Sequence, residues 1–186
     1  MKKIFVLTLL LFALKVSAAP TYSYKGGRTS VTLSSEFVTA LETLEISLGR
    51  IKPARIRAGV ARFPANFSEV DLADASAEIF HTGGLTLSSD TTVVELSNFI
   101  IDTDEGVLTG SVKVDNSIVD RIPLFNVTLS PDVATPLPAT PSLTVPASLT
   151  LTETAATTLN ATFGVEAFAA DLDVGSSSSA IRRGRD

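Results

Sequence analysis

The feature that most constrains the fold of this chain is a long run of alternating apolar and polar residues between Ala75 and Val127. Leu85 and Leu87, for example, are separated by a single polar residue. Successive side chains of a β-strand point to opposite faces, so this spacing predicts strands with one buried face. The segments are separated by turn-forming residues at Gly83-Gly84, Ser88 to Asp90, Asp102 to Gly106 and Asp115-Asn116. The run therefore predicts an antiparallel meander.

Two short helices are expected beside the strands. Apolar residues at helical spacing follow a serine cap and predict a helix over about Ser35 to Leu44. A second pattern of this kind predicts a helix over about Glu153 to Thr162. The fold class that follows is mainly β, an antiparallel β-sandwich or flattened barrel with two short helices that cover its open ends or edges.

Proline and basic residues mark two expected interruptions of the strands. Gly49 to Arg57 is rich in basic residues and is broken by Pro53, which predicts a loop. A strand that begins at Val60 is expected to stop at Pro64, because proline lacks the amide that a strand ladder needs.

The first residues have the pattern of a secretory signal peptide over residues 1–18. Lys2 and Lys3 precede the apolar run Ile4 to Leu14, and small residues lead to an expected cleavage after Ala18. This predicts an exported protein that is periplasmic, secreted or held at the cell surface. The apolar run is shorter than the roughly 20 residues that cross a bilayer, and no later segment is longer, so no membrane span is expected in the mature chain.

The mature chain is expected to form one β-rich domain over residues 19–175. It contains no cysteine, so disulfides and thiolate metal sites are excluded and stability must come from the core. Five prolines between Pro131 and Pro146 predict an irregular loop over residues 130–147. The serine run that begins at Ser176 and the arginines after it predict a disordered tail over residues 176–186.

The charge balance argues against nucleic acid as a partner. The chain carries 15 Lys and Arg against 20 Asp and Glu, and three of the lysines lie in the signal peptide, which leaves a net charge of -8 on the mature protein. A binder of the phosphate backbone needs a basic stripe and a positive field. Anionic lipid is disfavoured as a partner for the same reason.

His81 is the only histidine and the first candidate for a binding residue. A single histidine excludes multi-histidine zinc sites and allows a Ser-His-Asp arrangement only if His81 is the base. A hydrogen-bonded histidine at the end of a strand is the structural alternative. Asp102, Asp104 and Glu105 do not match the calcium-loop pattern, so no metal site is predicted. No catalytic residue is assigned.

A basic cluster supplies two further candidate binding residues, Arg55 and Arg57. It contains Arg50, Lys52, Arg55, Arg57 and Arg62, a third of all basic residues within thirteen positions. Guanidinium groups bind carboxylates in a bidentate manner, so the cluster can hold an acidic ligand. A solvated loop and strand face is the alternative.

Several segments in succession resemble the HtaA-type domain of bacterial secreted and surface haem-binding proteins. From about Ala58 to Asn126 they are AGVARFP, EIFHTGGLTLS, VVELSNFIID, VLTGSVKV and DRIPLFNV, followed later by LTETAATTLNATFGVEAFA. FHTGG is the most specific of these segments. The resemblance implies a β-rich fold and haem binding in which His81 assists. It also implies an iron-ligating tyrosine on the first helix, where this chain reads SEFVTALETL and has none.

The function predicted from these observations is an exported, non-enzymatic binding or surface module. Its expected ligand is a small hydrophobic molecule or a porphyrin such as haem, bound with the help of His81. Two other classes stay open: a small exported hydrolase that uses His81 or a carboxylate pair, and a structural matrix component. The sequence leaves the oligomeric state undetermined.

Overall fold

The computed structural model describes residues 21–183, and the predicted signal peptide lies outside this range. The helices are α1 (Ser35–Thr43) and α2 (Glu153–Phe163). The strands are β1 (Thr21–Tyr24), β2 (Gly27–Leu33), β3 (Ser47–Ile51), β4 (Arg55–Arg57), β5 (Val60–Asp71), β6 (Ala77–His81), β7 (Gly84–Ser88), β8 (Val93–Asp102), β9 (Val107–Val114), β10 (Ser117–Leu129), β11 (Ser142–Leu151) and β12 (Asp173–Arg182).

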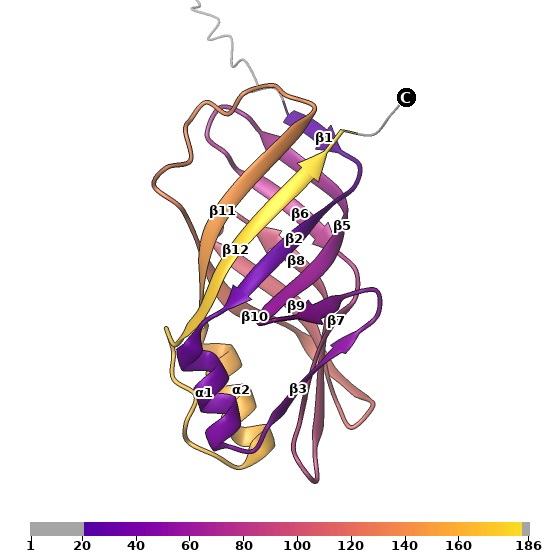
Figure 1. The fold of residues 1–186 in the computed structure, drawn as a ribbon, viewed down its shortest axis with the longest axis vertical. Helices are drawn as coiled ribbons and strands as arrows, with labels where there is room; N and C mark the ends of the chain where they lie inside the picture. Colours follow the sequence, from indigo (N-terminus) through magenta and orange to yellow (C-terminus); the bar gives the residue numbers. More distant parts are fainter. Residues whose placement is uncertain (1–20, 184–186) are drawn as a thin grey trace, which may run out of the picture.

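Eight of the strands close into an antiparallel barrel. Their order is β5, β2, β12, β11, β10, β9, β8 and β6, and β6 pairs back to β5. In Figure 1 the strands β11, β12, β2 and β5 lie side by side across the front of the barrel. The prediction of a mainly β fold with two short helices is confirmed, and the expected meander is present as β7 to β10.

The barrel closes because β8 changes partners along its length. Val93 to Ser97 pair with β7, whereas Ile100 to Asp102 pair with β6. Between the two segments the ladder is interrupted, and Asn98 has a positive φ of 53°. A bulge of this kind bends a strand and re-aims its side chains. Strands β7 and β3 then continue the sheet outside the barrel, while β1 and β4 add to β5.

The hydrophobic core fills the inside of the barrel, and alternation along each strand explains why. In β5, Ala61, Phe63 and Ala65 are buried, whereas Arg62 between them is exposed. The rings of Phe63 and Phe99 meet edge to face, with their centroids 5.2 Å apart. Aromatic pairs favour this geometry. The interior is therefore packed with side chains.

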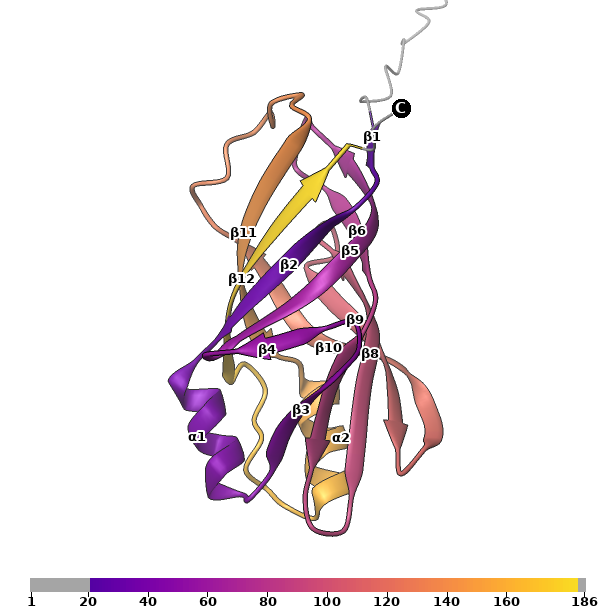
Figure 2. The ribbon, with the colours of Figure 1, turned by 45° about the vertical axis from the view of Figure 1, so that its right-hand side comes forward.

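Both helices lie at the same end of the barrel (Figure 1, Figure 2). Ser34 caps α1 by accepting a hydrogen bond from the amide of Phe37, and Thr152 caps α2 in the same way through Ala155. A cap of this type satisfies an amide that the first helical turn leaves free. Gly164 ends α2 in the left-handed conformation that glycine adopts readily. Both helix predictions are confirmed to within one residue at each end.

The predicted disordered tail over residues 176–186 is wrong for its first seven residues. They belong to β12, which runs from Asp173 to Arg182 between β2 and β11. Ser177 and Ser179 face the interior and are buried, while Ser176 faces outward. The segment looked disordered because its inward positions carry small polar residues in place of large apolar ones.

Two predictions about proline need correction. The irregular loop expected over residues 130–147 ends at Pro141, because β11 begins at Ser142 and contains Pro146. Strand β5 likewise continues through Pro64. The carbonyl of Pro146 accepts a hydrogen bond from the amide of Ser130, and the carbonyl of Pro64 accepts one from the amide of Thr82. The nitrogen of each proline faces the same side of the strand as its carbonyl. On that side the ladder with β10 or β6 has already ended, so the absent N–H costs no ladder hydrogen bond.

The basic segment Gly49 to Arg57 is not a continuous loop. Gly49 to Ile51 complete β3, which pairs with β7, and Arg55 to Arg57 form β4, which pairs with the start of β5. The turn between the two strands includes Pro53, where the sequence predicts an interruption. Arg50, Arg55 and Arg57, which the sequence places on a loop, are therefore held in register on a sheet.

Candidate functional site

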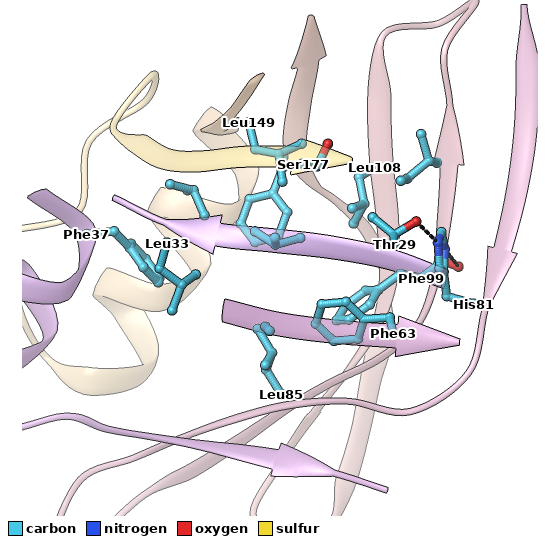
Figure 3. Close-up of a pocket in the computed structure, with 15 residues that line it drawn as sticks. Thr29, Leu33, Phe37, Phe63, His81, Leu85, Phe99, Leu108, Leu149 and Ser177 are labelled. Carbon is cyan, nitrogen blue, oxygen red and sulfur yellow. Dashed lines mark hydrogen bonds between the residues drawn. The ribbon is translucent and has the colours of Figure 1, made fainter. Parts of the chain in front are cut away.

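His81 lies inside the barrel at the end of β6, with 5% of its surface exposed. Its Nδ1 is 3.3 Å from the carbonyl oxygen of Phe99, and its Nε2 is 2.6 Å from the Oγ1 of Thr29 (Figure 3). A carbonyl only accepts, so Nδ1 carries the proton and Nε2 accepts from the Thr29 hydroxyl. Ser179 extends this hydrogen-bonded network, because its Oγ lies 2.8 Å from the Oγ1 of Thr29.

The imidazole of His81 is held in its neutral form. Burial lowers the pKa of His81 from 6.5 to about 4, against the opposing effect of hydrogen bonds to the backbone at Phe99 and Ile79. Removal from water disfavours the charged form of a histidine. At neutral pH His81 is therefore an uncharged, fully hydrogen-bonded side chain.

The space beside His81 is a small apolar cavity of about 30 Å³ (Figure 3). Thr29, Phe63, Phe99 and Leu108 are among the residues that line it. A second interior cavity, of about 20 Å³, lies against α2 near Ala155. Sites for organic ligands measure about 300 to 1,000 Å³, so neither cavity accepts a porphyrin.

The same geometry bears on the hydrolase alternative. A hydroxyl and an imidazole lie within hydrogen-bond reach, as in a nucleophile and base pair, and the third group is the Phe99 carbonyl in place of a carboxylate. A substrate would need room next to Thr29, where the cavity measures about 30 Å³. The arrangement therefore has the geometry of a buried structural network.

The two candidate arginines lie elsewhere. Arg55 and Arg57 are exposed on β4, outside the barrel, while His81 is enclosed within it. The three residues predicted from sequence are thus not brought together. Within residues 21–183, no group of three or more His, Cys, Asp or Glu side chains has the geometry of a metal site.

The structure reveals a groove that sequence reasoning missed. It has a volume of about 710 Å³ and lies at the helix-bearing end, between α1, β3 and the turn after β7. Its lining combines apolar side chains with three carboxylates; the residues are Val38, Leu41, Glu42, Glu45, Ile46, Ser47, Leu48 and Asp90. The groove joins segments that are separated by more than forty residues, so no local pattern signals it.

A row of carboxylates was also missed. Glu69 on β5 lies directly opposite Glu78 on β6, which lies opposite Asp102 on β8. The three residues line an open hollow of about 290 Å³. Strand pairing places these three carboxylates in neighbouring positions on adjacent strands.

In the part of the chain that the structure describes, no helix is long and apolar enough to cross a membrane. No known family model matches the sequence, and no curated protein is detectably similar to it.

Several solved structures resemble this fold. The C-terminal domain of HtaA from Corynebacterium glutamicum superimposes with a TM-score of 0.65 and 12% identity, covering 87% of this chain and 99% of that domain. The N-terminal HtaA domain gives a TM-score of 0.60 at 12% identity, covering 87% and 99%. The heme binding protein HtaB of the same organism gives 0.57 at 12% identity, covering 89% and 96%. The chain therefore has the fold of the HtaA and HtaB domains.

Proposed function

We propose that this chain is an exported, non-enzymatic binding module and that a porphyrin is its ligand. The observation that carries the proposal is the fold shared with the heme binding protein HtaB over 89% of this chain. Export is supported by the signal-peptide pattern of residues 1–18, and the secreted, periplasmic or surface location follows from it.

The interior of the barrel is packed, so the proposed porphyrin site lies on the surface. Since the internal cavities measure about 30 and 20 Å³, a porphyrin must bind outside the barrel. The groove beside α1, at about 710 Å³, has the required size, and Val38 and Leu48 offer apolar contact for a flat ring. Glu42, Glu45 and Asp90 repel the propionates, so these groups would point to solvent.

The side chains present do not fit an axial ligand for haem iron. Helix α1 carries neither tyrosine nor histidine, and both ring nitrogens of His81 are hydrogen-bonded inside the barrel. Tyr24 is fully buried, and Tyr22 lies on β1 at the end opposite the helices (Figure 1). Binding through the porphyrin ring, without a protein ligand to the metal, is the mode that this geometry supports.

A titration with two probes tests the proposal. Hemin and metal-free protoporphyrin IX are added to the mature chain, and absorbance and ligand fluorescence are followed. We expect both probes to bind with similar affinity, because the metal contributes no bond to the protein. Failure of both to bind at concentrations on the order of 100 μM, which corresponds to less than about 5.5 kcal/mol of binding free energy, would remove the porphyrin proposal.

Matched variants locate the site. Val38→Asp places a carboxylate in the groove and is expected to weaken both probes about ten-fold by repelling the ring and its propionates. Val119→Asp makes the same change at a side chain that is 54% exposed on the β9–β10 hairpin, and is expected to leave binding unchanged. Equal effects of the two variants would contradict the groove as the porphyrin site. Loss of binding in His81→Ala with the fold intact would contradict it as well.

A further inference from the structure

The front of the barrel carries an unusual set of outward side chains. Strand pairing puts Arg55, Arg62, Ser30, Ser178 and Pro146 in one row across five strands, from β4 to β11. The neighbouring rows are Arg57, Val60, Thr32, Ser176, Ser148 and Thr128, then Pro64, Arg28, Ala180 and Thr144, then Arg182 and Ser142. We call these four rows the arginine–hydroxyl face. In Figure 1 its strands β5, β2, β12 and β11 face the viewer.

The composition of the arginine–hydroxyl face is opposite to that of the whole chain. The chain has 20 Asp and Glu, yet none of them occupies the four rows, which contain five arginines and eight serine or threonine residues. The remaining positions carry valine, proline and alanine. A positive, hydroxyl-bearing surface is therefore segregated on an acidic protein.

Two of the arginines are in an unfavourable arrangement. Arg55 lies directly opposite Arg62 in the β4–β5 ladder, and like charges in this position destabilise a sheet. Among the described residues the one ion pair within 4.0 Å is that of Lys113 with Glu95, on β9 and β8. An anion bound between Arg55 and Arg62 would relieve the repulsion and could accept from both guanidinium groups.

A second position for an anion lies at the other end of the face. Arg28 on β2 and Arg182 on β12 line a shallow hollow of about 200 Å³, together with Gly27 and Ala180. Between this hollow and the Arg55–Arg62 pair, Ser30 and Ser178 stand opposite each other. Hydroxyls at this spacing, about 5 Å across strands and 7 Å along them, can each donate and accept a hydrogen bond.

We propose that the arginine–hydroxyl face binds an anionic polysaccharide, with guanidinium groups on its carboxylates and serine and threonine hydroxyls on its sugar hydroxyls. Arginine forks match carboxylate geometry, and repeated hydroxyls match a repeated polyol. No aromatic residue occupies the four rows, so base stacking, which single-stranded nucleic acid uses, has no platform there. The face likewise offers no large apolar side chain for insertion into a lipid surface.

The test is a titration of the mature chain with polygalacturonate at low salt, in which isothermal calorimetry measures the binding. We expect binding that weakens as salt rises, and no binding of neutral pullulan. The double variant Arg55→Gln/Arg62→Gln is expected to bind about ten-fold more weakly, since two charge-assisted contacts are lost. Lys113→Gln, which removes a positive charge on β9 outside the four rows, is the matched control and should bind as the parent does.

A second variant tests the role of the hydroxyls. Ser30→Ala/Ser178→Ala keeps every charge, and we expect it to lower affinity for polygalacturonate several-fold while leaving affinity for polyacrylate, a carboxylate polymer without sugars, unchanged. Circular dichroism checks that each variant is folded. Equal binding of Arg55→Gln/Arg62→Gln and Lys113→Gln would overturn the proposal. So would binding of duplex DNA as tight as that of polygalacturonate. Neither result depends on whether a porphyrin occupies the groove beside α1.

Discussion

The hydroxyl of Thr29 donates to the Nε2 of His81 over 2.6 Å, from the second strand of the chain to the sixth. Replacing Thr29 by valine keeps the shape of the side chain and removes the donor. The imidazole nitrogen is then buried without a partner, so we expect a loss of about 1–3 kcal/mol in the free energy of unfolding. Urea denaturation of parent and variant measures it.

The control for this substitution is Thr32→Val on the same strand, whose side chain faces solvent. It makes the same chemical change, and its effect is expected to stay within about 0.5 kcal/mol. If both variants lose the same free energy of unfolding, the loss would come from placing valine in this strand, and not from removal of the buried hydrogen bond.

The lowered pKa of His81 predicts a pH dependence of stability. The pKa is about 4 in the folded protein and 6.5 in the reference state, so between these values the unfolded chain binds more protons. Stability from this residue is complete above pH 6.5 and is lost as the pH falls toward 4. The total loss is about 3 kcal/mol.

The His81→Gln variant isolates this contribution, because all carboxylates are common to both proteins. Urea unfolding at pH 7.5, 5.5 and 4.5 should show the parent losing more stability than the variant on acidification. Parallel pH profiles would mean that the imidazole is accessible to protons in the folded state.

Two glycines in the β3–β7 region should respond differently to alanine. A Cβ at Gly84 would lie 2.0 Å from the carbonyl oxygen of Leu96, which belongs to the backbone of β8 and cannot move alone. A Cβ at Gly49 would meet the Oγ1 of Thr86 at 2.3 Å, and that side chain can rotate away. Gly84→Ala is expected to cost more than about 3 kcal/mol and Gly49→Ala less than about 1. Thermal denaturation of both variants measures the two losses. A larger loss for Gly49→Ala than for Gly84→Ala would contradict the prediction.

The carboxylate row predicts a stabilising substitution. Glu78 lies between Glu69 and Asp102 on adjacent strands, and like charges directly opposite each other are destabilising. Glu78→Lys converts two repulsions into two attractions and should raise stability by about 0.5–1 kcal/mol. Because Glu69 and Glu78 are exposed, the gain should shrink in 1 M NaCl. A gain that is insensitive to salt would point to packing as its origin.

Deletion of residues 176–186 distinguishes the observed strand from a tail. It removes most of β12, which pairs with β2 on one side and β11 on the other. We expect the truncated protein to lack a cooperative unfolding transition, because β2 and β11 lose their shared neighbour. Deletion of residues 184–186 alone is the control. A truncated chain as stable as the parent would contradict the position of β12.

The sequence predicts most local structure because local chemistry determines it. Alternation identified the meander, and the caps at Ser34 and Thr152 marked both helices. Strand β12 was missed because Ser177 and Ser179 replace apolar residues on its inner face. Strand pairing is non-local, so neither the hydrogen bond between Thr29 and His81 nor the approach of Arg55 to Arg62 could be foreseen.

The position of β12 has a consequence for how the molecule matures. Its neighbours are β2, from the beginning of the chain, and β11, from near the end, so the last strand completes the closed wall. While residue 182 is still inside the ribosome, β12 cannot pair along its full length and the wall of the barrel stays open. Closure of the barrel therefore follows synthesis of β12, because this strand alone pairs with both β2 and β11.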